Sequence, residues 1–375
     1  MRYFLVLIFG GLLLAPAAFG QGTSQTLLPT GDLSTKGNQI VDRNGRAVRL
    51  ACVGWNQVVE EIPLERQTAL MAKLGFNCIR HSWVNATKER DIAEIDRIAV
   101  AASKAGLRVI LDNHTNEGGH SERDNWGAQQ KNGLWYDLGG SSDGTDGGGN
   151  PGTVTDAKFL ADWEFVARHY LRNQTVIGYD LRNEPLKWPH MSVWGGGSDR
   201  DIASMYTRVG NAILAIDPTK LIIVEPPNSD CRGVRKYPLT LAVPNKLVYS
   251  VHEYPGEISG QKVSSGPGLI KRMNEEWGWI YNENVGPIFV GEMGSSMSSD
   301  QSKAWAETIV PYLNGTGPDS LHVPSGGQAV STDWWDWGNL SGQVPNGTLE
   351  ADWTTPRPEQ EAVYGKLRQA ALPDQ

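Results

Sequence analysis

Short apolar segments alternate along the chain with longer amphipathic segments. The short segments are typical of buried strands. We expect eight strands, over Leu50–Gly54, Asn77–Arg80, Arg108–Leu111, Val176–Tyr179, Leu221–Val224, Leu247–Val251, Ile288–Val290 and Ser331–Trp335. The longer segments repeat apolar residues at helical spacing, over Leu64–Leu74, Ile92–Ala105, Asp156–Leu171, Ile202–Ile216, Leu269–Asn282 and Ser302–Leu313. A regular strand–helix alternation predicts parallel strands joined by right-handed crossovers.

The number of strand–helix units favours one closed (β/α)8 TIM barrel. Before the first unit, Gln39–Val41 and Ala47–Arg49 flank the turn dipeptide Asn44-Gly45. This pattern predicts an N-terminal β-hairpin, which we place at the bottom of the barrel. A doubly wound open sheet is the alternative. It is less favoured because no glycine-rich phosphate-binding motif follows the first strand.

The first residues have the pattern of a secretory signal peptide. Arg2 precedes an apolar run over Phe4–Leu14, and the small residues Ala18 and Gly20 favour cleavage after Gly20. A transmembrane anchor, the alternative, needs about 20 apolar residues, which is more than this run provides. We therefore expect a signal peptide over residues 1–20, an N-terminal extension over residues 21–36 and one barrel domain over residues 37–372. The mature protein is expected to be extracellular or periplasmic.

The charge balance narrows the range of partners. The chain has 34 Lys and Arg against 42 Asp and Glu, a net charge of −8. With no basic cluster, it is not expected to bind nucleic acid or an anionic membrane surface. Its 14 Trp against 7 Phe, with 43 Gly, indicate long loops that carry aromatic side chains. We expect a monomer.

The three cysteines allow at most one disulfide. Cys52 and Cys78 both lie in apolar strand segments, so we favour buried free thiols. A Cys52–Cys78 bridge stays open, because only the geometry of the fold decides it.

In a TIM barrel the chemistry lies at the carboxyl-terminal ends of the strands. All but the first and fifth predicted strands end in ionisable, hydrogen-bonding or aromatic residues. These residues are Arg80 and His81, Asp112–His114, Asn183 and Glu184, His252–Tyr254, Glu292, and Trp334–Trp337. A Glu follows an apolar strand on both the fourth and the seventh strands, with His, Arg and Trp on the others. If these strand ends were polar only because they face solvent, this combination of residues would not be expected.

Two carboxyl groups that face each other across a barrel mouth are the minimum equipment for cleaving a glycosidic bond. One protonates the leaving oxygen, and the other attacks as a nucleophile or activates water. Glu184 and Glu292 are the candidate pair. Asn183 can hydrogen-bond a sugar 2-hydroxyl, whereas Arg80 and Tyr254 are donors suited to hold Glu292. For a retaining mechanism we expect the two carboxyl groups to lie about 5–5.5 Å apart.

The chain resembles glycoside hydrolase family 5, the retaining (β/α)8 enzymes that include secreted bacterial endo-β-1,4-glucanases, or cellulases. The resemblance covers roughly residues 37–353, and its strongest motifs are the Asn-Glu-Pro that ends at Pro185 and the Gly-Glu-Met-Gly that begins at Gly291. It implies that Glu184 is the acid/base and Glu292 the nucleophile. The other positions that match the family's active site are Arg80, His114, Asn183, His252, Tyr254 and Trp335.

Several Trp residues are candidate sugar platforms. We favour Trp335 as the floor under the sugar ring. Trp126, Trp135, Trp188 and Trp194 lie in the long loops after the third and fourth strands. There they can bind outer sugar rings or simply pack a loop.

Three classes of function stay open. The favoured class is a retaining β-glycanase acting on cellulose-type or mixed-linkage glucan. Mannan or xyloglucan as substrate, exo cleavage and transglycosylation are alternatives within this class. A non-catalytic carbohydrate-binding barrel is less favoured, because this chain keeps both carboxylates.

A metal-dependent barrel enzyme is the third class. His81, His114 and His252 lie on different strands without a paired ligand set. The glycine-rich stretch Gly139–Gly152 carries acidic residues, but its spacing does not match an EF-hand, so we expect a surface loop there. The sequence therefore predicts no metal and no cofactor.

Overall fold

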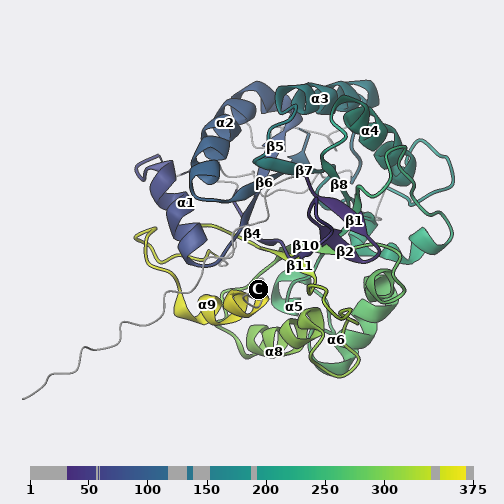
Figure 1. Cartoon of the computed structure of the whole chain (residues 1–375). Coiled ribbons are helices and arrows are strands. Elements are labelled where there is room, and N and C mark those ends of the chain that lie inside the picture. The colour runs from purple at the N-terminus through teal and green to yellow at the C-terminus, as the bar shows by residue number, and fades with distance from the viewer. Residues whose placement is uncertain are drawn as a thin grey trace, which may run out of the picture.

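Eight parallel strands close into a barrel in the order β10-β11-β4-β5-β6-β7-β8-β9 (Figure 1). In this computed structural model the strands are β4 (Ala51–Gly54), β5 (Cys78–Val84), β6 (Arg108–Thr115), β7 (Val176–Asp180), β8 (Leu221–Val224), β9 (Leu247–His252), β10 (Ile288–Met293) and β11 (Ser331–Trp334). The first and last of them, β4 and β11, pair with each other and close the sheet. The predicted TIM barrel is confirmed, and the open doubly wound sheet is wrong.

The structure describes residues 32–55, 58, 60–116, 133–137, 153–186, 192–338 and 347–368. The predicted signal peptide and the glycine-rich stretch Gly139–Gly152 lie outside these residues, as do Trp126 and Trp188. Among the helices within these ranges, none has the length and apolar character that a membrane span requires.

Helices form the outer layer around the barrel (Figure 1). Between the strands lie α1 (Leu64–Lys73), α2 (Lys88–Lys104), α3 (Asp156–His169), α4 (Ile202–Ile216), α5 (Gly256–Ser259), α6 (Gly266–Met273), α7 (Trp279–Asn282) and α8 (Asp300–Asn314), and α9 (Pro358–Tyr364) follows the last strand. Short 3₁₀ segments are η1 (Asn85–Thr87), η4 (Pro227–Ser229), η5 (Cys231–Arg235) and η7 (Gly365–Leu367). A π-helical turn, η6 (Asn274–Gly278), divides the helix predicted over Leu269–Asn282 into α6 and α7.

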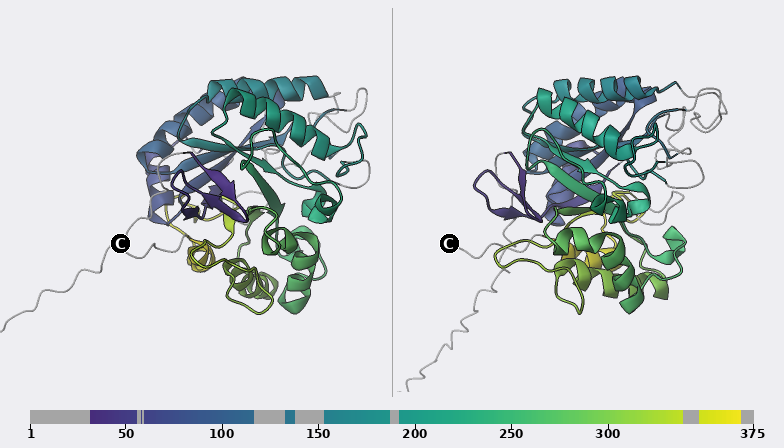
Figure 2. Two further views of the ribbon diagram at one scale, coloured as in Figure 1. Left: turned by 45° about the vertical axis from the view of Figure 1, so that its right-hand side comes forward. Right: turned by 90° about the vertical axis from the view of Figure 1, so that its right-hand side faces the viewer.

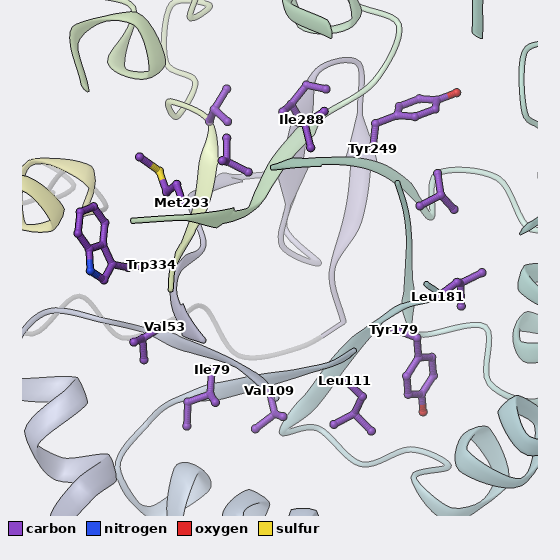
Figure 3. Packing of buried hydrophobic residues seen from close by; sticks show 14 of the residues in the cluster. Val53, Ile79, Val109, Leu111, Tyr179, Leu181, Tyr249, Ile288, Met293 and Trp334 are labelled. Carbon is purple, nitrogen blue, oxygen red and sulfur yellow. The ribbon is translucent and has the colours of Figure 1, made fainter. Parts of the chain in front are cut away.

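The barrel strands are buried on both faces, which explains their continuous apolar runs. Alternate side chains point outward, and Figure 3 shows Val53, Ile79, Val109 and Leu111 directed away from the barrel. These side chains belong to one large cluster with buried helical residues such as Ile95 of α2. Outward packing against the helices therefore holds the two layers together.

Inside the barrel, the side chains of β5 and β6 change from apolar to polar along the strand. On β6, alternation directs Ile110, Asp112 and His114 to the same face, and on β5 it does the same for Cys78 and Arg80. Ile110 and Cys78 belong to an apolar cluster near the start of the strands. Arg80 and Asp112 form a fully buried ion pair further along. The first half of the interior is thus a core, and the second half is the floor of a polar site.

A small antiparallel sheet closes the amino-terminal end of the barrel. It consists of β1 (Ser34–Lys36), β2 (Gln39–Val41) and β3 (Ala47–Val48). Ile40 and Val48 of this sheet pack in the same cluster as the inward-facing apolar strand residues. Figure 2 shows the sheet, in purple, at one end of the barrel. The predicted hairpin at the bottom of the barrel is confirmed, and β1 adds a strand that the sequence pattern did not predict.

Cys52 and Cys78 form a disulfide, so the expectation of two buried free thiols is wrong. The two residues are direct partners in the pairing of β4 with β5, and both face the barrel interior. The sequence pattern does not specify the register between neighbouring parallel strands, and so the proximity of the two thiols was not visible there. Cys231 is buried and does not form a disulfide.

Candidate active site

A cleft of about 660 Å³ lies at the carboxyl-terminal ends of the strands. Six of the predicted site residues line it, namely His114, Glu184, His252, Tyr254, Glu292 and Trp335. The other two, Arg80 and Asn183, are buried directly beneath them, in contact with Glu292 and His114. Closure of the barrel therefore brings all eight predicted residues into one site, although they come from six different strand ends.

Two donors hold the carboxylate of Glu292. Nη1 of Arg80 donates to Oε1 at 2.9 Å, and the hydroxyl of Tyr254 donates to Oε2 at 2.9 Å. Both contacts were expected from the sequence. Burial, together with the charges of Glu292 and Glu184, raises the pKa of Tyr254 well above its ordinary value. The phenol therefore keeps its proton and stays a donor to Glu292.

Arg80 connects several strand ends below the cleft. Its Nε donates to Oδ2 of Asp180 at 3.0 Å, and Nη2 donates to Oδ1 of Asn183 at 2.9 Å. Nη2 also forms an ion pair with Oδ1 of Asp112 at 2.9 Å. Burial opposes the positive charge, but the carboxylates of Asp112, Asp180 and Glu292 outweigh burial and raise the pKa of Arg80. A planar guanidinium with several fixed donors suits this role better than a lysine would.

His252 lies between the two candidate catalytic carboxyl groups. Its Nδ1 is 2.9 Å from Oε1 of Glu184 and 3.5 Å from Oε2 of Glu292. Burial lowers the pKa of His252, but the charges of Glu225, Glu292 and Glu184 outweigh burial and raise it. A protonated ring between the carboxylates reduces their mutual repulsion.

Glu184 and Glu292 approach each other closely. One carboxylate oxygen of each, with a ring nitrogen of His252, lies within 4.8 Å of the other two atoms. Such spacing can hold a cation, but both oxygens of Glu292 already accept hydrogen bonds, and the charge of Arg80 lies beside them. The guanidinium would repel a metal ion there.

Trp335 forms an aromatic wall of the cleft. Its ring stacks on His114, with centroids 5.6 Å apart and an angle of 10° between the planes. Nδ1 of His114 lies 2.6 Å from Oδ2 of Asp112, which also accepts the hydroxyl of Ser82 at 3.0 Å. Gly54 at the end of β4 makes room for the indole, because a Cβ there would lie 2.5 Å from the Trp335 ring.

Two of the proposed sugar platforms have packing contacts instead. Trp135 is 3% exposed, and its indole N–H donates to Asp156 at 2.6 Å. The indole N–H of Trp194 donates to the carbonyl of Tyr237 at 2.9 Å, and its side chain packs against Gly233. Neither residue is among those that line the cleft. Of the two interpretations given for these residues, the structure therefore favours loop packing.

The fifth strand contributes to the site, and the expectation that its end carries no functional group is wrong. Glu225 directly follows β8, is 1% exposed and lines the cleft. Its Oε2 accepts the backbone N–H of Glu184 at 2.7 Å. The signal in the sequence is the one that finds Glu292, a Glu next to an apolar strand. Asp180 and Asp333, both buried inside the barrel near Arg80, were also not predicted.

A closed (β/α)8 barrel with two carboxyl groups facing each other in the cleft at its carboxyl-terminal face is an arrangement typical of glycoside hydrolases. The model of the family Cellulase (glycosyl hydrolase family 5) matches residues 36–341, and the chain belongs to this family.

Relatives of known name agree with this membership. An endoglucanase of Paenibacillus polymyxa is 28% identical over 380 residues, which cover 88% of this chain and 85% of the relative. The major extracellular endoglucanase of Xanthomonas campestris is 26% identical, with 88% of this chain and 69% of the relative covered. The fold is similar to that of an endocellulase from Pyrococcus horikoshii solved in complex with cellotetraose. The TM-score is 0.71 at 22% identity, with 90% of this chain and 99% of the other covered.

Proposed function

We propose that this glycoside hydrolase is an endo-β-1,4-glucanase that cleaves cellulose-type or mixed-linkage glucan with retention of configuration. Glu184 is the acid/base, and Glu292 is the nucleophile. The proposal rests above all on the approach of these two carboxyl groups, one oxygen of each lying within 4.8 Å of the other. Retaining enzymes hold their carboxyl groups about 5–5.5 Å apart, whereas inverting enzymes leave about 6.5–9.5 Å for a water.

The first half-reaction forms a covalent intermediate. Oε of Glu292 attacks the anomeric carbon, and Glu184 donates its proton to the glycosidic oxygen as the bond to that oxygen breaks. Arg80 and Tyr254 hold Glu292 in line for attack, because each donates to one of its oxygens at 2.9 Å. Trp335 supplies a flat apolar surface for the sugar ring.

The second half-reaction releases the sugar and restores the site. Glu184, now a carboxylate, takes a proton from a water that attacks the anomeric carbon. Glu292 leaves as a carboxylate, again held by its two donors. Asn183, fixed by its bond to Arg80, is the residue we assign to the sugar 2-hydroxyl.

The names of the relatives support the substrate and the location. Two are named endoglucanases, one of them extracellular, and one structural neighbour was solved with cellotetraose. We therefore assign this chain a β-1,4-glucan substrate and export after cleavage near Gly20. The mature enzyme acts as a monomer through the domain over residues 37–372.

The substitution Glu292→Ala tests the assignment of the nucleophile. We expect turnover to be abolished and the fold to persist, because the side chain lines the cleft and Arg80 keeps its ion pairs with Asp112 and Asp180. Azide, a small external nucleophile, is expected to restore activity and to give a glycosyl azide of inverted configuration. The control Glu276→Ala removes a carboxylate from the wall of the same cleft, and azide is not expected to accelerate it. A Glu292→Ala enzyme that is active without azide contradicts the assignment.

A substrate panel tests the specificity separately. Release of reducing sugar is measured on cellulose, mixed-linkage glucan, mannan and xyloglucan, with the product sizes resolved. We expect oligosaccharides of mixed length from the first two polymers. Release of a single short product indicates exo cleavage, and faster release from mannan indicates a β-mannanase with the same catalytic pair.

A further inference from the structure

The turn that carries Glu184 has an uncommon backbone conformation. Glu184 has a φ of +42°, and Asn228 and Ser229 at the end of η4 each have a φ of +57°. Residues other than glycine rarely adopt the left-handed region and need specific contacts to stay there. The two segments are joined directly, because the N–H of Asn228 donates to the carbonyl of Pro185 at 2.8 Å.

The carboxylate of Glu225 provides further contacts between these segments. Its Oε2 accepts the backbone N–H of Glu184 at 2.7 Å, and its Oε1 accepts the hydroxyl of Ser229 at 2.9 Å. The same hydroxyl oxygen accepts the backbone N–H of His252 at 2.8 Å. The carbonyl of Glu225 is itself fixed, because it accepts the hydroxyl of Tyr206 at 2.8 Å. One buried side chain thus ties the ends of β7, β8 and β9 together.

A second connection passes through the ring of His252. Its Nε2 lies 3.5 Å from Oε2 of Glu225, and its Nδ1 lies 2.9 Å from Oε1 of Glu184. Glu225 therefore contacts the backbone of Glu184 and also the ring that contacts the Glu184 carboxyl group. The first contact fixes the backbone of Glu184, from which the side chain projects. The second fixes the His252 ring, which contacts the carboxyl group.

We propose that Glu225 is a positioning residue that aims the carboxyl group of Glu184 at the glycosidic oxygen. The inference rests on the proposed role of Glu184 as the acid/base. A displacement of about 1 Å at a reacting group can cost about 10²-fold in rate. Loss of Glu225 is therefore expected to weaken proton donation, while Glu292, which is held by separate donors, keeps its place.

The test compares two substrates that differ in their need for a proton. We would measure kcat/KM on an unactivated cello-oligosaccharide and on an activated aryl cellobioside for the wild type, Glu225→Ala and Glu225→Gln. Glu225→Ala is expected to lose about 10²-fold on the oligosaccharide and far less on the aryl glycoside. The amide oxygen of Glu225→Gln still accepts the N–H of Glu184, but the amide NH2 group cannot accept the hydroxyl of Ser229. We therefore expect a loss of roughly tenfold on the oligosaccharide alone.

A matched control lies at the other end of the barrel. Arg172 has a φ of +58°, and its N–H donates to the buried carboxylate of Asp217 at 2.7 Å. This arrangement repeats that of Glu184 with Glu225, but it precedes β7 and β8 and is remote from the cleft. Asp217→Asn is expected to leave the ratio of the two kcat/KM values as in the wild type, even where the melting temperature falls.

Equal losses on both substrates, or no loss on either, overturn the positioning role. If Glu225→Ala does not fold, the isosteric Glu225→Gln decides by the same criteria. Glu184→Ala is measured in parallel and separates the two hypotheses. If it shows no preference for the activated substrate, the acid/base assignment fails. If Glu184→Ala shows this preference and the Glu225 variants do not, only the positioning role of Glu225 fails.

Discussion

The proton on Glu184 is needed most when the leaving group is poor. In the proposed mechanism Glu184→Ala therefore lowers kcat/KM for a natural glucan far more than for an aryl glycoside with a good leaving group. General acid catalysis contributes typically about 10²–10⁴-fold, so we expect a contrast of that order. Measuring kcat/KM on both substrate types checks this prediction. Azide is expected to accelerate the variant and to give a product of retained configuration, because Glu292 still forms the intermediate. Equal losses on both substrates would count against the assignment.

At the scale of single residues, the sequence identified candidate site residues that end a strand and lie in a short motif. It missed residues whose role depends on a contact with a distant part of the chain. Glu184 and Glu292 stand out because each follows an apolar strand and lies in a short motif. Glu225 also follows an apolar strand, but its importance comes from the N–H of Glu184, about forty residues earlier in the chain. No local pattern reveals such a partner. The same holds for Trp135, whose burial distinguishes a packing residue from a sugar platform.

The start of α4 offers a test at the scale of one element. Asp201 is the N-cap of α4 and accepts the backbone N–H of Ser204, and it also accepts those of Gly195 and Gly197 in the preceding loop. Asp201→Ala removes all these acceptors. Since loss of an N-cap costs about 0.5–2 kcal/mol, we expect a decrease of that size or somewhat more in the free energy of unfolding, measured by denaturant titration. The exposed neighbour Asp199 serves as a control, and Asp199→Ala is expected to have little effect.

The pH dependence of this cap follows from its pKa. Burial raises the pKa of Asp201, but the N–H groups of Gly197 and Gly195 and the hydroxyl of Ser204 outweigh burial and lower it. A carboxyl group whose pKa is lowered by folding stabilises the native state above its ordinary pKa, about 3.9, and loses that contribution as the pH falls through its folded value. Asp201→Asn keeps a good cap without the charge. We expect the stability difference between wild type and Asp201→Asn to be constant at neutral pH and to shrink below about pH 4. A difference that grows on acidification would contradict this sign.

The elements that sequence reasoning placed well are those with uniform apolar patterns. The observed bounds of β8 and α4 equal the predicted ones, because one is a plain apolar run and the other a regular amphipathic helix. Strands β5 and β6 extend several residues past their predicted ends. Their later residues include polar groups such as Ser82, Asp112 and His114, which interrupt the apolar run. The polar residues of the site therefore made the ends of these two strands hard to predict from the apolar pattern.

For the molecule as a whole, local alternation was sufficient to predict the barrel. Eight parallel strands and the rule of right-handed crossovers leave few other closed arrangements. The alternation does not predict which residues of neighbouring strands are paired. The sequence therefore favoured free thiols at Cys52 and Cys78, which the structure joins in a disulfide. It also gave no indication of β1, which is only three residues long and depends on pairing with β2.

The Cys52–Cys78 disulfide gives the last prediction, which concerns global stability. It joins β4 to β5 around α1, with a sequence separation of 26 residues. Closing a loop of that length in the unfolded chain contributes about 3–4 kcal/mol in the chain-entropy model. We expect reduction, or the double substitution Cys52→Ala with Cys78→Ala, to lower the melting temperature by roughly 5–10 °C. Cys231→Ala is the control, because it removes the cysteine outside the disulfide and is expected to keep the sensitivity of the melting temperature to reductant. An oxidised and a reduced protein that melt at the same temperature would show that the bridge adds nothing. A large difference would also fit export, because such bridges persist in oxidising compartments.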